Sequence, residues 1–323
     1  MSDASSAHRL AELSTRLARC PDLDTLVSTA LAGLAELFGY EHSLLLLLDE
    51  RGERLYTIAS HGYPTEGVGS EVRVGDGIIG MAAARAESMR VGNLKQMLAY
   101  ARTVRRAYEE GGGAAPGLEI PLPGLPNAES QVAVPAMVLG QLVAVVAVES
   151  ERRLAFTPID EALVSVVASL VASAIEIDQA QERAGADRSG ADRTEPVDGS
   201  NAAPRRASAV ATAAVTRVRF FAVDGSTFLD DDYLIKGVAG RILWVLLGHH
   251  VRDGRVEFTN KEVRLDPSLE LPEFRDNLES RLILLKRRLD ERDAPIRIEK
   301  TGRGRFRLVV DATLALHAVE PDA

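Results

Sequence analysis

The stretch Val72–Leu94 reads VRVGDGIIGMAAARAESMRVGNL. Gly75-Asp76-Gly77 is a turn sequence, because glycine adopts the positive φ angles that tight turns require. It follows a short predicted strand at Glu71–Val74 and leads into a small helix at Ile78–Arg85. Ser88–Val91 is a further strand. A strand, turn, helix and strand in this order indicate an α+β domain.

The residues on either side extend this pattern to residue 182. Thr157-Pro158 is a typical helix start, with threonine at the N-cap and proline at the first helical position. Leu139-Gly140 reads as a tight turn between two strands. The predicted helices are Ala7–Arg19, Leu23–Phe38 and Ile159–Glu182, and the predicted strands are Ser43–Asp49, Arg54–Ser60, Gln131–Val138 and Gln141–Glu149. This order predicts an antiparallel sheet flanked by helices.

Two segments, Val72–Leu94 and Val132–Ile175, resemble a GAF domain. GAF domains have a similar Gly-x-Gly-Ile-x-Gly turn before a short helix, and a similar ending with a glycine between two strands and an alanine-rich helix. The resemblance covers nearly all of Leu23–Glu182. It implies that residues 1–182 form a sensor or dimerisation domain, which binds a small-molecule effector between its sheet and helices.

The resemblance leaves the ligand unknown. The Asn-Lys…Phe…Asp-Glu signature of cyclic-nucleotide-binding relatives is absent. A bilin requires a cysteine for its thioether bond, and Cys20 lies outside the elements that would form the pocket. His42 and His61 are candidate axial ligands for haem, but a lone histidine beside a strand is more often a turn or edge residue. Thus the sequence carries no bilin, haem or cyclic-nucleotide signature, and we expect no metal site.

The final helix of this domain is rich in small and apolar residues, including Ala172, Ala174 and Ala180. Small side chains permit close helix approach, and such helices commonly pair across a two-fold axis in GAF proteins. We therefore expect a homodimer.

Residues 183–212 are expected to form a flexible linker. Arg183–Val210 contains no aromatic residue, leucine or isoleucine, and so has too little apolar surface to offset the entropy of ordering. Charge also differs across this segment. Residues 204–323 carry 21 basic and 19 acidic residues, a net of +2, whereas the rest of the chain carries 38−21 = 17 basic and 47−19 = 28 acidic residues, a net of −11. This asymmetry indicates a division of labour between two domains.

Residues 213–312 resemble the winged helix-turn-helix domain of OmpR-type response regulators, and 313–323 read as a tail. The resemblance depends on a long helix at Glu273–Asp290 and on the sequence TGRGRFRL at Thr301–Leu308. It implies that the helix enters the major groove of double-stranded DNA and that the β-hairpin wing contacts the backbone or minor groove. The implied DNA-binding residues are Arg275, Asn277, Arg281, Lys286, Arg287, Arg288, Arg303 and Arg305.

We therefore predict a signal-responsive transcriptional regulator. The alternative is a non-enzymatic signalling adaptor whose winged helix binds a protein partner. It is favoured by acidic residues in the same helix, such as Glu279, and by a net charge of only 19−16 = +3 over Arg217–Val310. No nucleophile–histidine–carboxylate set, GxxxxGK[ST] loop or HExxH motif is present, so we expect no enzyme and no catalytic residue.

The chain is expected to be cytoplasmic and to bind no membrane. A single cysteine, Cys20, cannot form an intramolecular disulfide, which fits a reducing compartment. The N-terminus lacks a basic segment followed by an apolar run. The longest strongly apolar runs, Leu44–Leu48 and Leu142–Val148, are far shorter than the roughly 20 residues that span a bilayer.

Overall fold

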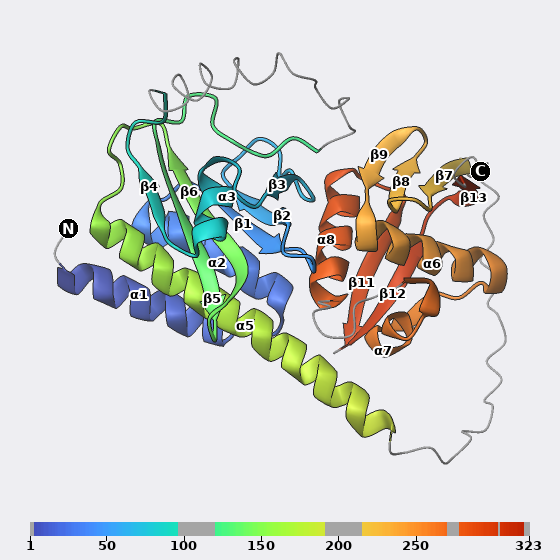
Figure 1. The fold of residues 1–323 in the computed structure, drawn as a ribbon. Helices are drawn as coiled ribbons and strands as arrows, with labels where there is room; N and C mark the ends of the chain where they lie inside the picture. Colours follow the sequence, from blue (N-terminus) through green and yellow to red (C-terminus); the bar gives the residue numbers. More distant parts are fainter. Residues whose placement is uncertain (1–2, 96–119, 191–214, 270–277, 303, 320–323) are drawn as a thin grey trace. The chain divides into compact units, whose positions relative to one another are not determined.

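The computed structural model describes residues 3–95, 120–190, 215–269, 278–302 and 304–319, with the backbone alone for 3, 4 and 182–190. These residues divide into two compact units between Ile177 and Asp178. Figure 1 shows the elements of each unit in chain order.

The first unit is built on one six-stranded antiparallel sheet with the strand order β3-β2-β1-β6-β5-β4. Its elements are α1 (Asp3–Ala18), α2 (Leu23–Phe38), β1 (His42–Leu48), β2 (Arg54–His61), β3 (Glu71–Arg73), α3 (Gly77–Arg85), β4 (Met89–Val91), β5 (Ser130–Val138), β6 (Gln141–Ser150) and α5 (Pro158–Gly190). The expected antiparallel sheet flanked by helices is therefore present.

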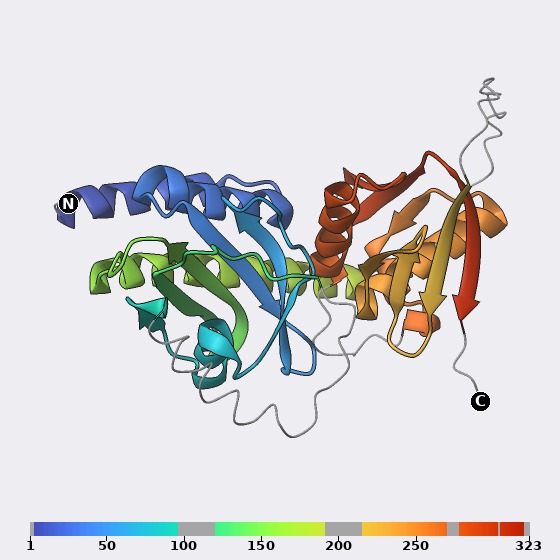
Figure 2. The same ribbon diagram turned by 90° about the horizontal axis from the view of Figure 1, so that it is seen from above.

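The sheet of the first unit is covered by α1, α2 and α5 on one side and by α3 on the other (Figures 1 and 2). Asp22 caps α2 by accepting a hydrogen bond from the Thr25 amide, and Gly39 ends the helix in the left-handed conformation. The hairpin turn between β5 and β6 has positive φ at Leu139 and Gly140, as predicted.

Helix α5 is longer than expected and extends to Gly190, into the segment predicted as linker. The stretch Pro158–Gln181 of this helix is long and apolar enough to cross a membrane. Of an apolar 18-residue segment within it, 39% is buried. Val164, Val167, Val171 and Ile175 are among its buried side chains. Packing within the unit thus accounts for part of the apolar composition of the helix. The rest of the predicted linker, 191–212, lies outside the described residues.

After α5, the described residues of the second unit form two small sheets and three α-helices. Its elements are β7 (Val215–Phe221), β8 (Ser226–Leu229), β9 (Asp232–Ile235), α6 (Gly237–Asp253), β10 (Glu257–Thr259), α7 (Asn260–Arg264), η1 (Pro267–Leu269), α8 (Leu278–Glu291), β11 (Ile296–Gly302), β12 (Arg305–Val310) and β13 (Thr313–Val319). The sheets have the orders β13-β7-β8-β9 and β10-β12-β11.

One prediction for the second unit was wrong. Residues 313–323 were expected to be a tail, but Thr313–Val319 form β13, which pairs in parallel with β7. Helix α6 has an apolar face, on which Ile242, Leu243 and Leu246 are fully buried. Helix α7 begins with a reciprocal capping box between Thr259 and Glu262.

Candidate functional site

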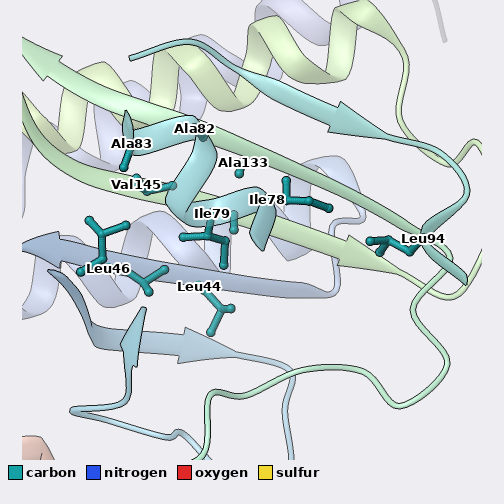
Figure 3. Close-up of a cluster of buried hydrophobic side chains, with 11 residues drawn as sticks. Leu44, Leu46, Ile78, Ile79, Ala82, Ala83, Leu94, Ala133 and Val145 are labelled. Atoms are coloured by element: carbon teal, nitrogen blue, oxygen red, sulfur yellow. The ribbon is translucent and has the colours of Figure 1, made fainter. Parts of the chain in front are cut away.

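The face of the first sheet that lies against α3 is apolar at its centre (Figure 3). Ile78, Ile79, Ala82 and Ala83 of α3 are buried there. They pack with side chains that alternate along four strands and with one residue after β4, and these are Leu44, Leu46, Leu55, Ala133, Val145, Ala147 and Leu94. Partly buried apolar residues, including Leu48, Val72 and Met89, surround the cluster.

The glycine-rich turn fixes α3 on this face. The Gly75 amide donates to the Gly80 carbonyl at 2.8 Å, and the Gly80 amide donates to the Asp76 carbonyl at 2.9 Å. A Cβ atom at Gly80 would collide with the backbone oxygen of Arg73. Only glycine therefore lets the start of α3 come so close to the end of β3.

A polar group of side chains lies at one end of the same face and is centred on Glu149 of β6. The Tyr63 hydroxyl donates to Glu149 Oε2 at 3.0 Å, and the Leu125 amide donates to the same oxygen at 3.1 Å. The Gln131 side-chain amide donates to Oε1 at 3.0 Å. His42 lies opposite Glu149 on β1, and its ring meets the Tyr63 ring at a centroid distance of 5.4 Å.

Burial governs the protonation of this group. It raises the pKa of the Glu149 carboxyl, and the hydrogen bonds from Leu125 and Tyr63 and the proximity of His42 only partly offset this effect. Burial, followed by the nearby Glu149 charge, raises the pKa of Tyr63 as well. Tyr63 is therefore a neutral hydrogen-bond donor at physiological pH. The sequence analysis missed Glu149, because a single glutamate at a strand end carries no signal of its own.

The histidines considered for haem gain no metal-site partners in the described part of the chain. Among the described residues, no group of three or more histidine, cysteine, aspartate or glutamate side chains could hold a metal ion.

The predicted DNA-binding residues fall into three groups. Arg275, Asn277 and Arg303 lie outside the described residues. Lys286 and Arg287 are partly exposed on α8, and Arg305 is exposed at the start of β12. Arg281 and Arg288 are buried, with 7% and 6% of their surfaces exposed.

The buried position of Arg288 contradicts its assignment to DNA. Its Nε donates to the Leu234 carbonyl at 2.8 Å, and its Nη1 donates to Glu291 at 2.7 Å. Arg288 therefore joins α8 to β9. Arg281 lies in the first turns of α8 and is also buried.

Glu279 on α8 has a structural role. From the sequence it was interpreted only as an unfavourable charge on a DNA-binding helix. It is 8% exposed. Its carboxylate accepts hydrogen bonds from Lys300 on β11 and, at 3.0 Å, from Asn260 at the start of α7. The backbone amide of Asn260 also donates to the Gly304 carbonyl at 2.9 Å. Glu279 thus joins α7, α8 and the β11–β12 hairpin.

The exposed side of α5 carries apolar and small side chains. Ile159, Val166 and Ile177 are 53%, 41% and 56% exposed. Ser169 and Ser173 lie between them and donate their hydroxyls to backbone carbonyls one turn earlier, at 2.9 and 2.8 Å. These serines satisfy their hydrogen bonds within the helix, so the side offers little competition to apolar contact.

Comparison with known proteins identifies the first unit. A family model of the GAF domain matches residues 20–176. A solved GAF domain of a phosphoenolpyruvate-protein phosphotransferase from Acinetobacter is 19% identical and covers 56% of this chain and 97% of its own, with a TM-score of 0.45. The GAF domain of such a protein from Coxiella burnetii is 17% identical and covers 56% and 99%, with a TM-score of 0.44.

A free methionine-R-sulfoxide reductase from Neisseria meningitidis is also similar, at 18% identity, 55% and 92% coverage and a TM-score of 0.41. The search of curated proteins found no match. The family match ends within α5, before the second unit begins.

Proposed function

We propose that the chain is a signal-responsive transcriptional regulator, on the basis of the GAF-domain match over residues 20–176. A GAF domain implies a signal-sensing or dimerisation role. In this proposal the first unit senses a small-molecule effector, and the second unit binds double-stranded DNA through a winged helix-turn-helix.

The observation that carries the DNA proposal is the order of elements in the second unit. Three α-helices, α6, α7 and α8, are followed by the antiparallel hairpin β11–β12, and β10 adds a third strand to that hairpin. Phe258 of β10 stacks on Phe306 of β12, with their ring centroids 5.8 Å apart. The third helix and the hairpin of a winged helix are the parts that contact DNA.

The proposed DNA contacts of the described residues are Lys286, Arg287 and Arg305. Arg275, Asn277 and Arg303 remain proposals from the sequence. Arg288 no longer belongs to this set, because it is buried and bonded to Leu234 and Glu291. Arg281 remains a proposal from the sequence. Basic side chains on the hairpin and late in α8 would neutralise phosphates and supply a salt-dependent affinity.

Binding to random duplex DNA over a salt series tests this proposal. Arg305→Ala should weaken binding and lower the salt slope by about one. Arg297→Ala is the matched control, since Arg297 lies at the other end of the hairpin and pairs with Asp311 at 2.6 Å. Absence of salt-sensitive binding by the folded wild type would refute the DNA proposal.

The alternative is a signalling adaptor whose second unit binds a protein. The engagement of Glu279 favours it, because hydrogen bonds from Asn260 and Lys300 occupy this carboxylate within the second unit. In the same salt series, this function predicts no DNA binding in any variant.

We also propose that the first unit forms a homodimer through the exposed side of α5, defined by Ile159, Val166, Ser169, Ser173 and Ile177. Successive positions in this set are seven, three, four and four residues apart, so all five lie on one stripe along the helix. The helix has 33 residues and is therefore about 50 Å long. A paired copy would cover apolar surface along this length.

A further inference from the structure

The last strand of the second unit has an outer edge that is suited to pairing. Strand β13 stands at the end of the sheet order β13-β7-β8-β9, and all seven of its residues pair with β7 in an uninterrupted parallel register. Figure 2 shows it as the red strand at the rim of this unit. Its sequence, TLALHAV, contains no proline, aspartate, glutamate, lysine or arginine. Prolines, charged side chains and bulges are the features that normally prevent edge strands from pairing.

The other sheet edges among the described residues carry such features. Strands β3, β4 and β10 have three residues each, and very short strands offer little to pair with. Strand β9 begins with Asp232 and has an irregular register with β8. Strand β11 carries Arg297, Glu299 and Lys300, and its register with β12 is irregular near its end. Of these described edges, β13 alone combines length, regularity and an apolar sequence.

The backbone of β13 presents hydrogen-bonding groups at its outer edge. The Ala222 amide donates to the Val319 carbonyl at 3.4 Å, so the backbone groups of Val319 point toward β7. Successive residues of a strand direct their backbone groups to opposite sides. Those of Leu314, Leu316 and Ala318 therefore point outward, and each of these residues offers one N–H donor and one carbonyl acceptor.

The side chains of the same three residues bring an apolar layer to this edge. Leu316 lies opposite Val218 of β7, on the same face of the sheet. Val218 is fully buried, whereas Leu316 is partly buried. Leu314 is also partly buried, and Ala318 is exposed. Burial thus decreases from β7 to β13, and an additional strand beside β13 would cover the apolar side chains at the edge.

We propose that β13 pairs in the antiparallel direction with β13 of a second copy, about a two-fold axis at Leu316. This register opposes all seven residues of the strand. Its central pairs are Leu316 with Leu316, Leu314 with Ala318, and Ala315 with His317. The outward-pointing residues of the two copies would form about six backbone hydrogen bonds. No opposed pair brings like charges together, and the Leu316 side chains of both copies would meet at the axis.

This inference rests on the homodimer proposed through α5. A contact between two seven-residue strands is smaller than the interface of a stable dimer, so it requires a second contact that holds the copies together. Each contact joins identical surfaces, which is the arrangement of a closed two-fold dimer. In the proposed DNA-binding function, two winged helices paired in this way would bind an inverted repeat.

Disulfide capture in the full chain tests the register. Ala315→Cys and His317→Cys are introduced singly and together into a Cys20→Ser chain, which has no other thiol. The proposed pairing brings the Cα atoms of opposed positions 315 and 317 to about 4.5 Å, whereas equivalent positions of the two copies are about 7–8 Å apart. The double variant should therefore form cross-linked dimers at least about fivefold faster than either single variant. Equal rates in the three proteins, or no cross-linking in the double variant, would overturn the proposal.

Two substitutions at Ala318 test the backbone contact in the double-cysteine chain. Ala318→Pro removes an outward-pointing N–H and leaves the hydrogen bonds to β7 in place, so the unit should remain folded. It should slow cross-linking at least about fivefold, whereas Ala318→Val, which keeps the donor, should not. Equal effects of the two substitutions in folded proteins would contradict the pairing.

The mass of the wild type separates this inference from the dimer on which it rests. A dimeric wild type whose double-cysteine variant does not cross-link would overturn the β13 pairing and leave the α5 dimer standing. A monomeric wild type would overturn both. Since no DNA is present, neither result depends on the DNA proposal.

Discussion

The Tyr40 hydroxyl donates a 2.6 Å hydrogen bond to Asp160 Oδ1 and so joins the connection between α2 and β1 to the first turn of α5. Asp160 also accepts from the Thr157 hydroxyl and amide, at 2.6 and 2.7 Å. Burial alone would raise the pKa of Asp160, but the hydrogen bonds from Thr157 and Tyr40 outweigh it and lower that pKa.

This balance predicts an acid-dependent loss of stability. Because the folded pKa of Asp160 lies below its unfolded value of about 3.9, the carboxylate stabilises the fold above that pH. The contribution disappears as the pH falls through the folded pKa. Asp160→Asn should therefore lose less stability than the wild type between about pH 5 and 3, as measured by urea unfolding. Parallel pH curves for the two proteins would contradict this account.

Glu149 predicts the opposite pH dependence. Its pKa is raised by burial, so ionisation costs stability in the folded state. The contribution of Glu149 to the free energy of unfolding should therefore increase as the pH falls through its folded pKa toward the unfolded value of about 4.3. Glu149→Gln should lack that gain, and the difference between the two unfolding curves should grow toward neutral pH. A difference in the free energy of unfolding that stays constant with pH would contradict the raised pKa of Glu149.

Gly80→Ala should destabilise the first unit, because the added methyl group would meet the backbone oxygen of Arg73. We expect a loss of roughly 1–3 kcal/mol in the free energy of unfolding, measured with urea. Gly124→Ala is the control, since nothing lies within 4 Å of the corresponding Cβ. Similar losses in both variants would argue against the close approach.

Arg288→Ala should destabilise the second unit. The substitution leaves the Leu234 carbonyl and the largely buried Glu291 carboxylate without this partner. A loss of roughly 2–4 kcal/mol is expected. The adjacent, partly exposed Arg287 is the matched control, and its alanine variant should lose clearly less. Thermal unfolding of both variants decides whether Arg288 is structural.

If α5 forms the proposed homodimer, Val166→Glu should convert it to a monomer, because the substitution places a charge in the exposed apolar side of α5. Light scattering after size-exclusion chromatography measures the mass. Val223→Glu introduces the same charge at a position that is 69% exposed in the second unit, and it should remain dimeric. A monomeric wild type would refute the proposed dimer.

Local chemistry made much of the first unit predictable. The glycines around α3, the Leu139-Gly140 turn and the start of α5 each act through neighbours in sequence, and their positions agree with expectation. The Glu149 group could not be predicted in this way. Strand register brings His42, Glu149 and Gln131 together from β1, β6 and β5, and Tyr63 reaches Glu149 from the segment after β2.

The second unit was harder to predict for two physical reasons. Parallel pairing of β13 with β7 depends on a partner at the opposite end of the unit, and the short segment after β12 gives no sign of it. An arginine on a helix also reads as a surface residue, although its guanidinium can be buried against a carbonyl and a carboxylate, as Arg288 is. Burial of Arg281 and Arg288 therefore became evident only from the structure.

The pairing of β13 with β7 also determines when the second unit can be completed during synthesis. Strand β7 leaves the ribosome first, and the whole stretch 222–312 must follow before Thr313–Val319 can reach it. Until then one edge of β7 has its backbone groups open to other chains. The nascent second unit therefore passes through a stage in which it is prone to association, and this stage ends when its last strand is in place.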